Sequence, residues 1–380
     1  MTARTRRVRM TLGGLLSAAL SACAHPAPAV TPAPAVTHRF YDSRPYGSEA
    51  EFNPFSIIVN EGFDQLRTST RRNLLPLPYR ASAIVVLHSL ANPERVLRHY
   101  GYRNWLRNEV FPLTTKAQGG GQWYPNYQLH LFGAGMTYAR LAEWYEQHGY
   151  TSHPRILAGA TAFAFHFLNE MIETGPTFRD DEDSLTDLMI FDPASIVLWN
   201  QEWVLHRFGG RLEMTDWQGQ ASIGEPGTTI ENAYSMVMLR APLPRTDQWK
   251  VMTTAGNAFL IGISRRVGSE YWLTASGGFD PSDNPVIDPR TNAKTATLLP
   301  DVGVFVDRNS SLLASFISKG GSNNGATLNL YPGVLRMGRV SPGLWVQGIR
   351  GGGLRFGIES RIGLGLAGFG FIPRHAPSEP

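Results

Sequence analysis

The stretch 354-L-R-F-G-I-E-S-R-I-G-L-G-L-366 alternates between two kinds of residue. Its even positions are almost all large and apolar, whereas its odd positions are arginine, glutamate or glycine. Successive side chains of a β-strand point to opposite sides, so a period of two places these sets on opposite faces. We therefore predict a strand with one apolar face and one charged or bare face, long enough to cross a membrane at a tilt.

Shorter stretches with the same period precede it from Gly209 onward, separated by turns rich in glycine, proline and aspartate. They are Ser235–Arg240, Trp249–Thr254, Ala258–Ser264, Tyr271–Ser276, Val302–Val306, Leu312–Ser318, Thr327–Tyr331 and Leu344–Ile349. Their regular spacing predicts an antiparallel β-domain over residues 209–372, either a barrel or a curved sheet, followed by a tail at 373–380. Most are shorter than the roughly 9–11 residues of a membrane-spanning strand, so a periplasmic domain packed on helices is an equal alternative.

Residues 38–208 predict a helical module, which makes the fold class α+β. The expected helices are Tyr79–Ser89, Pro93–Glu109, Tyr127–His148, His153–Thr174 and Asp183–His206, the last interrupted at Asp192-Pro193. None contains 18 uncharged apolar residues in a row, so no transmembrane helix is expected.

The first 22 residues have the character of a secretion signal, with four arginines before the apolar segment Thr11–Ala19. The sequence Leu20-Ser21-Ala22-Cys23 then resembles the lipobox of bacterial lipoproteins, and Cys23 is the only cysteine. This resemblance implies cleavage before Cys23 and its lipidation; Ala24 in the next position favours the outer membrane. Residues 23–37 continue as a Pro/Ala tether that would hold the folded part away from the lipid, facing the periplasm.

The net positive charge of the chain comes largely from this predicted signal. Removing residues 1–22 removes four arginines and no acid, which leaves 31 Lys and Arg against 31 Asp and Glu. A neutral chain without a basic stripe predicts no nucleic-acid partner. The expected partner is the membrane.

The stretch from Trp123 to Asn200 places polar side chains among apolar helical ones. A polar group in such surroundings is costly unless it is hydrogen-bonded, so these side chains either hold helices together or take part in chemistry. His166, Glu170 and Glu173 follow at helical spacing and share one predicted helix face. The other members of this predicted polar network are Trp123, Asn126, His130, Ser184, Asp187 and Asp192.

Three interpretations of the network are open. It could lock helices together, with Ser184–Asp187 as a capping box and Asp192-Pro193 as a helix restart. It could perform acid/base chemistry, with Glu170 as base, His130 as proton partner and Asp187 orienting His130. It could bind a divalent metal. We adopt the structural interpretation, which assigns no cofactor and no metal.

The order Trp123-x2-Asn126-x3-His130, then Glu170-x2-Glu173, then Ser184-x2-Asp187 resembles an uncharacterised family of Gram-negative envelope proteins. More distantly, the spacing of histidine, glutamate and aspartate is similar to that of the VanZ-like membrane proteins. The resemblance implies an envelope location and brings no established activity.

These observations predict a non-catalytic outer-membrane lipoprotein that organises the envelope or binds a lipid or other apolar ligand. Glycines inside the predicted strands leave space that such a ligand could fill. The alternative is a membrane-surface hydrolase or transferase that acts on lipid or cell-wall precursors through His130, Glu170 and Asp187.

Overall fold

The computed structural model describes residues 40–64, 66, 73–112, 124–174, 181–224, 227–256, 258–287, 294–320, 324–349, 352–359 and 361–371. The predicted signal, Cys23 with its tether, Trp123 and the tail 373–380 lie outside these residues. Contacts group Thr37–Pro380 into one compact unit, which contains both the helices and the strands. No helix in the described ranges combines the length and the apolar character needed to cross a membrane.

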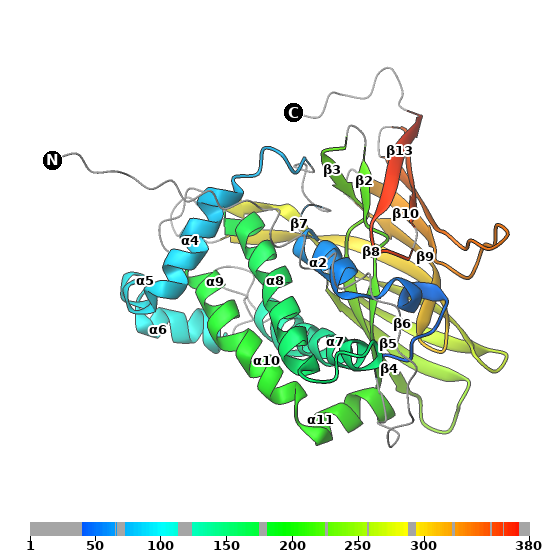
Figure 1. Ribbon diagram of the computed structural model, residues 1–380, viewed down its shortest axis with the longest axis horizontal. Helices are drawn as coiled ribbons and strands as arrows, with labels where there is room; N and C mark the ends of the chain where they lie inside the picture. Colours follow the sequence, from blue (N-terminus) through cyan, green and yellow to red (C-terminus); the bar gives the residue numbers. More distant parts are fainter. Residues whose placement is uncertain are drawn as a thin grey trace. The chain divides into compact units, whose positions relative to one another are not determined.

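Helices occupy the first part of the described chain and strands the second, as Figure 1 shows from blue to red. The α-helices are α2 (Pro54–Gly62), α4 (Tyr79–Ala91), α5 (Pro93–Tyr100), α6 (Tyr102–Trp105), α7 (Gly135–Gln147), α8 (Pro154–Thr174), α9 (Glu182–Thr186), α10 (Asp192–Trp199) and α11 (Glu202–His206). Between them lie a 3-10 turn, η1 (Gly47–Glu51), and the π-helical segments η2 (Leu106–Val110), η3 (Tyr124–Ala134), η4 (Asp187–Phe191) and η5 (Arg207–Arg211).

Local sequence explains where several helices begin and end. Asn53 and Ser56 cap α2 reciprocally, and Pro54 occupies its first turn. Gly149, just beyond α7, has a φ of 87°, the left-handed conformation that stops helices and favours glycine. The predicted start of α8 near Pro154 is confirmed.

The described strands form one 13-stranded sheet in the order β1-β4-β5-β6-β7-β8-β9-β10-β11-β12-β13-β2-β3. Their bounds are β1 (Glu213–Gln218), β2 (Ser222–Gly224), β3 (Thr229–Glu231), β4 (Ser235–Pro242), β5 (Trp249–Gly256), β6 (Phe259–Val267), β7 (Tyr271–Ile287), β8 (Lys294–Arg308), β9 (Ser311–Lys319), β10 (Asn324–Leu330), β11 (Gly343–Ile349), β12 (Leu354–Glu359) and β13 (Gly365–Phe371). Neighbours are antiparallel except β13 and β2, which pair in parallel through Gly365 and Ser222. The α+β class and the antiparallel strands are confirmed; the sheet is open, with β1 and β3 at its ends, and is not a closed barrel.

The predicted single strand 354–366 is wrong in its length. It forms two strands, β12 and β13, joined by a turn at Arg361 and Gly363, whose φ values are 23° and 92°. The turn packs tightly on α2, since a Cβ on Gly363 would lie 2.2 Å from the Ser56 Cβ. Asn53 Nδ2 also donates to the Ile362 carbonyl at 3.2 Å. Contact with α2 therefore bends the chain where alternation alone predicts a straight strand.

Two apolar cores lie on opposite sides of β4. Val237 packs with α7, α8 and Trp199 in the core beneath the helices. Its neighbours Met236 and Met238 point the other way, into a core with Trp217, Phe305 and Tyr331. The helices thus cover one face of the first strands, and the second core fills the opposite side.

A Glu51→Gln variant is expected to be more stable than the parent at pH 8 and little changed at pH 4. Burial, followed by the charge of Glu359, raises the pKa of Glu51 well above its ordinary 4.5. Above that unfolded value the folded chain must hold a proton that the unfolded chain releases. Stability then falls by up to about 1.4 kcal/mol per pH unit until the folded pKa is reached. Thermal unfolding at both pH values measures the effect, and the same pH slope in parent and variant would contradict it.

Candidate functional site

Five titratable side chains from four helical elements meet inside the helical region. His130 lies on η3, His166 and Glu170 lie one turn apart on α8, and Asp187 and Asp192 come from η4 and the start of α10. All are buried except His130, whose side chain retains 13% of its exposure. The structure brings His130, Glu170 and Asp187 together, with one ligand atom of each within 4.8 Å of the others.

A π-turn brings Asp187 and Asp192 to the same side of their segment. Residues five apart point about 140° away from each other in an α-helix. Here the Asp192 amide donates to the Asp187 carbonyl, the i to i+5 bond of a π-helix, whose wider turn reduces that angle. Both carboxylates therefore reach the same histidine. π-turns are rare and occur often at functional sites.

Both nitrogens of His130 face a carboxylate. Its Nδ1 lies 3.2 Å from Asp192 Oδ1, and its Nε2 lies 3.3 Å from Asp187 Oδ2. The other Asp192 oxygen lies 2.6 Å from His166 Nδ1, and the two imidazole rings are 4.7 Å apart. Asp192 thus holds both rings in place.

A chain of hydroxyl groups holds Glu170 on the other side of the site. Ser184 Oγ lies 2.6 Å from Glu170 Oε2 and 2.7 Å from Asp181 Oδ2. A hydroxyl has a single hydrogen, so Ser184 donates to one of these carboxyl groups at a time. Thr174 Oγ1 also contacts Ser184 Oγ, at 3.2 Å.

Burial and pairing shift the pKa values of the two histidines in opposite directions. Burial alone lowers the pKa of His130, but the hydrogen bond and charge of Asp192 outweigh it and raise the pKa to about 9. Burial lowers the pKa of His166, which therefore stays neutral. Burial also acts to raise the pKa of Asp192, but the two histidines lower it to about 2. His130 and Asp192 form a buried ion pair at neutral pH.

The other two carboxyl groups behave in the opposite way. Burial, then the charge of Asp187, raises the pKa of Glu170 well above its usual range. Burial, then the charges of Asp183 and Asp192, does the same for Asp187. Groups with pKa values moved in opposite directions are typical of acid/base or metal-binding sites, although structural networks also produce them.

Two further predicted members, Asn126 and Glu173, lie outside this cluster. Asn126 is fully buried, and its Nδ2 donates to the Glu109 carbonyl at 2.8 Å. Glu173 is exposed, although helical spacing predicted it on the face of His166 and Glu170.

Two local predictions are wrong. The N-cap of α9 is Asp181, whose Oδ1 accepts from the Ser184 amide, and Ser184 is not the cap. Asp192 does not cap a helix restart, because the preceding residue is already helical and the Asp192 carboxylate is bound to histidines. The interruption lies instead at Asn200-Gln201, between α10 and α11.

Sequence reasoning missed two acids beside the cluster. Asp181 bonds Ser184, and Glu109 accepts from the Tyr100 hydroxyl at 3.0 Å. Burial and the charge of Asp183 raise the pKa of Glu109 to about 8. An acidic run, Asp180 to Asp183, is visible in the sequence, but no periodicity links it to Glu109.

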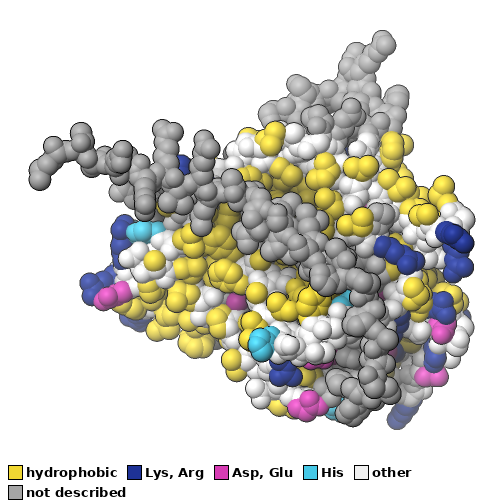
Figure 2. Space-filling model, viewed as in Figure 1, with side chains coloured by type: hydrophobic (Ala, Val, Ile, Leu, Met, Phe, Trp, Pro, Cys, Tyr) yellow, Lys and Arg dark blue, Asp and Glu magenta, His cyan; other side chains and the backbone are white. Residues whose placement is uncertain are grey.

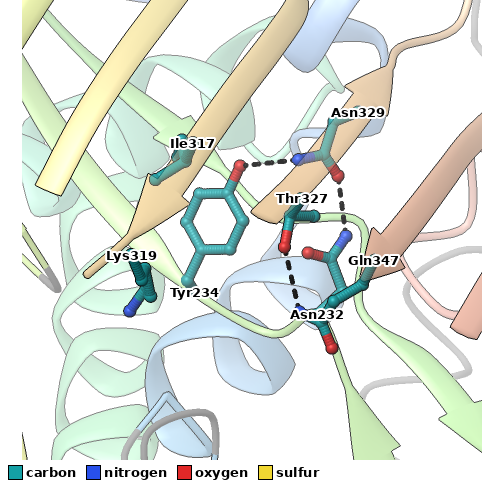
Figure 3. A pocket seen from close by; sticks show the side chains of 7 residues that line it. All are labelled: Asn232, Tyr234, Ile317, Lys319, Thr327, Asn329 and Gln347. Carbon is teal, nitrogen blue, oxygen red and sulfur yellow. Dashed lines mark hydrogen bonds between the residues drawn. The ribbon is translucent and has the colours of Figure 1, made fainter. Parts of the chain in front are cut away.

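A small cavity lies inside the sheet, lined by the side chains drawn in Figure 3. Its volume of about 10 Å³ suits a single water molecule. Hydrogen bonds cross it, including Asn232 Nδ2 to Asn329 Oδ1 at 2.8 Å and Gln347 Nε2 to Thr327 Oγ1 at 2.9 Å. The cavity is too small and too polar for a lipid.

On several strands of the sheet the apolar side chains face outward and the charged or polar ones face inward, the reverse of a typical water-soluble sheet. On β12, Leu354, Phe356 and Ile358 are 47–48% exposed, while Arg355 and Glu359 are buried. The same inversion places Asp301 and Asp307 of β8 inside and Val302 and Val304 outside. A separate gathering of hydrophobic side chains, mainly over the helical side of the molecule, is seen in Figure 2. Large exposed apolar surfaces of this kind mark sites of interaction.

Comparison with known proteins gives no match, whether to a family model, to a curated protein or to a solved structure. The resemblance to envelope proteins read from Trp123 to Asp187 therefore stays a prediction.

Proposed function

We propose that this chain is a lipid-anchored protein of the outer membrane whose sheet places its apolar face against the acyl chains of the bilayer. It organises the envelope or holds lipid there, and no catalysis is required of the sheet. The observation that carries the proposal is a continuous exposed row of apolar residues across neighbouring strands.

The row follows from the strand registers. Directly opposed residues run from β6 to β12, each pairing with the next. They are Ile263, Ala275, Val304, Phe316, Leu328, Val346 and Phe356, and all are exposed. Six strand spacings of about 4.8 Å make this row about 29 Å wide. Water would contact every one of these side chains if nothing covered them.

Parallel rows extend the apolar surface along the strands. On one side of the main row lies a row that contains Leu273, Val306 and Ile358. On its other side lies a row that contains Val302 and Leu354. From Leu273 to Phe279 on β7, six steps of about 3.4 Å cover about 20 Å. That height is about two thirds of the hydrocarbon thickness of a bilayer, about 30 Å.

Aromatic and charged residues border this surface at one end. Tyr271 is 41% exposed and lies under the Arg308 guanidinium, 5.7 Å from ring centre to Cζ. Trp249 similarly lies under Arg265 at 5.6 Å. Tyrosine, tryptophan and arginine are typical of the level of lipid head groups. The predicted lipid on Cys23 would keep the same surface close to the membrane.

A full-length chain with Cys23→Ala, which cannot carry the lipid, is expected to float with phosphatidylethanolamine and phosphatidylglycerol vesicles. Leu328→Arg, in the middle of the exposed row, should lower the bound fraction at least tenfold. A cation among acyl chains costs about 2.5–3.5 kcal/mol at the bilayer centre. Density-gradient flotation measures the bound fraction.

Ile156→Arg is the matched control, because Ile156 is 67% exposed on α8 and far from the row in sequence. It should float like the Cys23→Ala parent. Circular dichroism checks that both arginine variants fold. A Cys23→Ala chain that stays away from vesicles, or floats equally well with Leu328→Arg, would refute the proposal.

A membrane-surface hydrolase or transferase acting on lipid or cell-wall precursors is the second candidate. It is supported by the convergence of His130, Glu170 and Asp187, where a protonated acid and an imidazole lie side by side. The burial of Glu170 and Asp187, with only 13% of the His130 side chain exposed, favours tight packing over free access of a large substrate.

A further inference from the structure

The cluster in the helical region suits an ion better than the structural role assigned to it from the sequence. We propose that His130 Nε2, Glu170 and Asp187 together bind one divalent transition-metal ion. One ligand atom of each lies within 4.8 Å of the others. The three residues come from η3, α8 and η4, so an ion there would join three segments.

The separation of two ligand atoms already fits a metal. His130 Nε2 and Asp187 Oδ2 are 3.3 Å apart. Two ligands at about 2.0–2.2 Å from a tetrahedral ion lie about 3.4 Å from each other. Small side-chain movements would bring Glu170 to the third position.

One buried oxygen in the cluster has nothing to bind. Asp187 is 3% exposed, and its Oδ1 has no hydrogen-bond partner in the described part of the chain. Leaving such an oxygen unsatisfied destabilises the fold, and more so if it is charged. A bound cation would satisfy it.

The groups behind the three ligands are arranged as they are around metal ions. Asp192 Oδ1 accepts the Nδ1 proton of His130 in a hydrogen bond, so Nε2 faces Asp187 and can bind an ion once an incoming cation displaces its proton to solvent. Ser184 Oγ lies at 2.6 Å from Glu170 Oε2 and leaves the other oxygen available. Metal-binding histidines nearly always carry such a carboxylate on their second nitrogen.

Charge also favours a cation. Glu170, Asp187 and Asp192 are all within the cluster, and no lysine or arginine of the described ranges pairs with them. A divalent ion would supply the missing counter-charge.

The ligand set selects the kind of ion. One imidazole nitrogen with two carboxylates suits Zn²⁺, Mn²⁺ or Fe²⁺. Ca²⁺ prefers six to eight oxygen ligands and is disfavoured here. Three protein ligands also leave a position for water, the composition of catalytic zinc sites.

The test is a titration of the full chain, stripped with a chelator, with Zn²⁺ alone by calorimetry. We expect one ion per chain, and a loss of affinity of about 100-fold in Asp187→Asn, which keeps the side-chain size. Glu173→Gln, an exposed change on α8 outside the cluster, is the matched control and should alter affinity less than threefold.

Co²⁺ gives a second readout that does not depend on heat. The parent should show the visible absorption of a four- or five-coordinate ion, and Asp187→Asn should lose it while circular dichroism stays unchanged. Should Asp187→Asn fail to fold, Glu170→Gln takes its place. The proposal is overturned if the parent binds no Zn²⁺ at 100 µM, or if the ligand variant binds as tightly as the parent.

Discussion

Replacing Arg240 with methionine is expected to destabilise the chain by about 3–5 kcal/mol. Arg240 and Asp307 are fully buried, and the Arg240 Nη2 donates to Asp307 Oδ2 at 2.7 Å. Methionine is close to arginine in length but leaves the Asp307 charge buried, with the Ser310 amide, at 3.1 Å, as its remaining hydrogen-bond donor among the described residues. Most of the lost stability comes from leaving the Asp307 carboxylate buried without a cation, and less comes from the ion pair itself.

The double variant Arg240→Met/Asp307→Asn separates these contributions. Its asparagine keeps an acceptor for the Ser310 amide but carries no charge, so most of the lost stability should return. Urea unfolding measures all three chains. The control is Arg266→Met, whose partner Asp247 is 77% exposed at 3.8 Å, and which should cost less than about 0.5 kcal/mol. A double variant as unstable as Arg240→Met alone would show that the charge is not the cause.

The second large effect is expected for Asp192→Ala, measured in chelator so that no metal contributes. Asp192 is the partner of both His130 and His166; without it His166 loses its Nδ1 contact, and His130 keeps the longer contact to Asp187. His130 has a folded pKa of about 9 against an ordinary 6.5, a difference equivalent to about 3 kcal/mol. We expect a destabilisation of that size.

The pH dependence identifies the cause. A histidine with a raised folded pKa contributes its full stability below the unfolded value of 6.5 and loses it as the pH rises towards 9. The difference between Asp192→Ala and the parent should therefore be largest at pH 6 and much smaller at pH 9. Glu94→Ala, which breaks an exposed pair with Arg98, serves as control and should cost under about 0.5 kcal/mol at both. A difference that does not vary with pH would mean that Asp192 acts only through packing.

Much of the fold could be predicted because its signals are local. The alternation around Phe356 marks a strand, and Gly149 marks the end of a helix. Alternation does not say which face is inside, so the burial of Arg355 and the exposure of Leu354 could not be predicted. Strand β1 was missed because five of its six residues are buried, which removes the period of two.

The sequence indicated which residues belong to the candidate site, but little of how they are arranged. His166 and Glu170 share a face because α8 is regular. Asp187 and Asp192 share one only because their segment widens into a π-turn, and α-helical spacing predicts the reverse. The placement of His130 between them depends on contacts between distant segments, which no local pattern records.

The parallel pairing of β13 with β2 sets the order in which the chain can fold. Ser222 and its partner Gly365 are separated in sequence by most of the sheet, so β2 pairs on this side only when the last strand is in place. The helices rest largely on local bonds and can form earlier. The pairing closes a very long loop, which makes it a slow step. Until it is complete, the edge of β2 and the apolar rows of the unfinished sheet are open to misassembly.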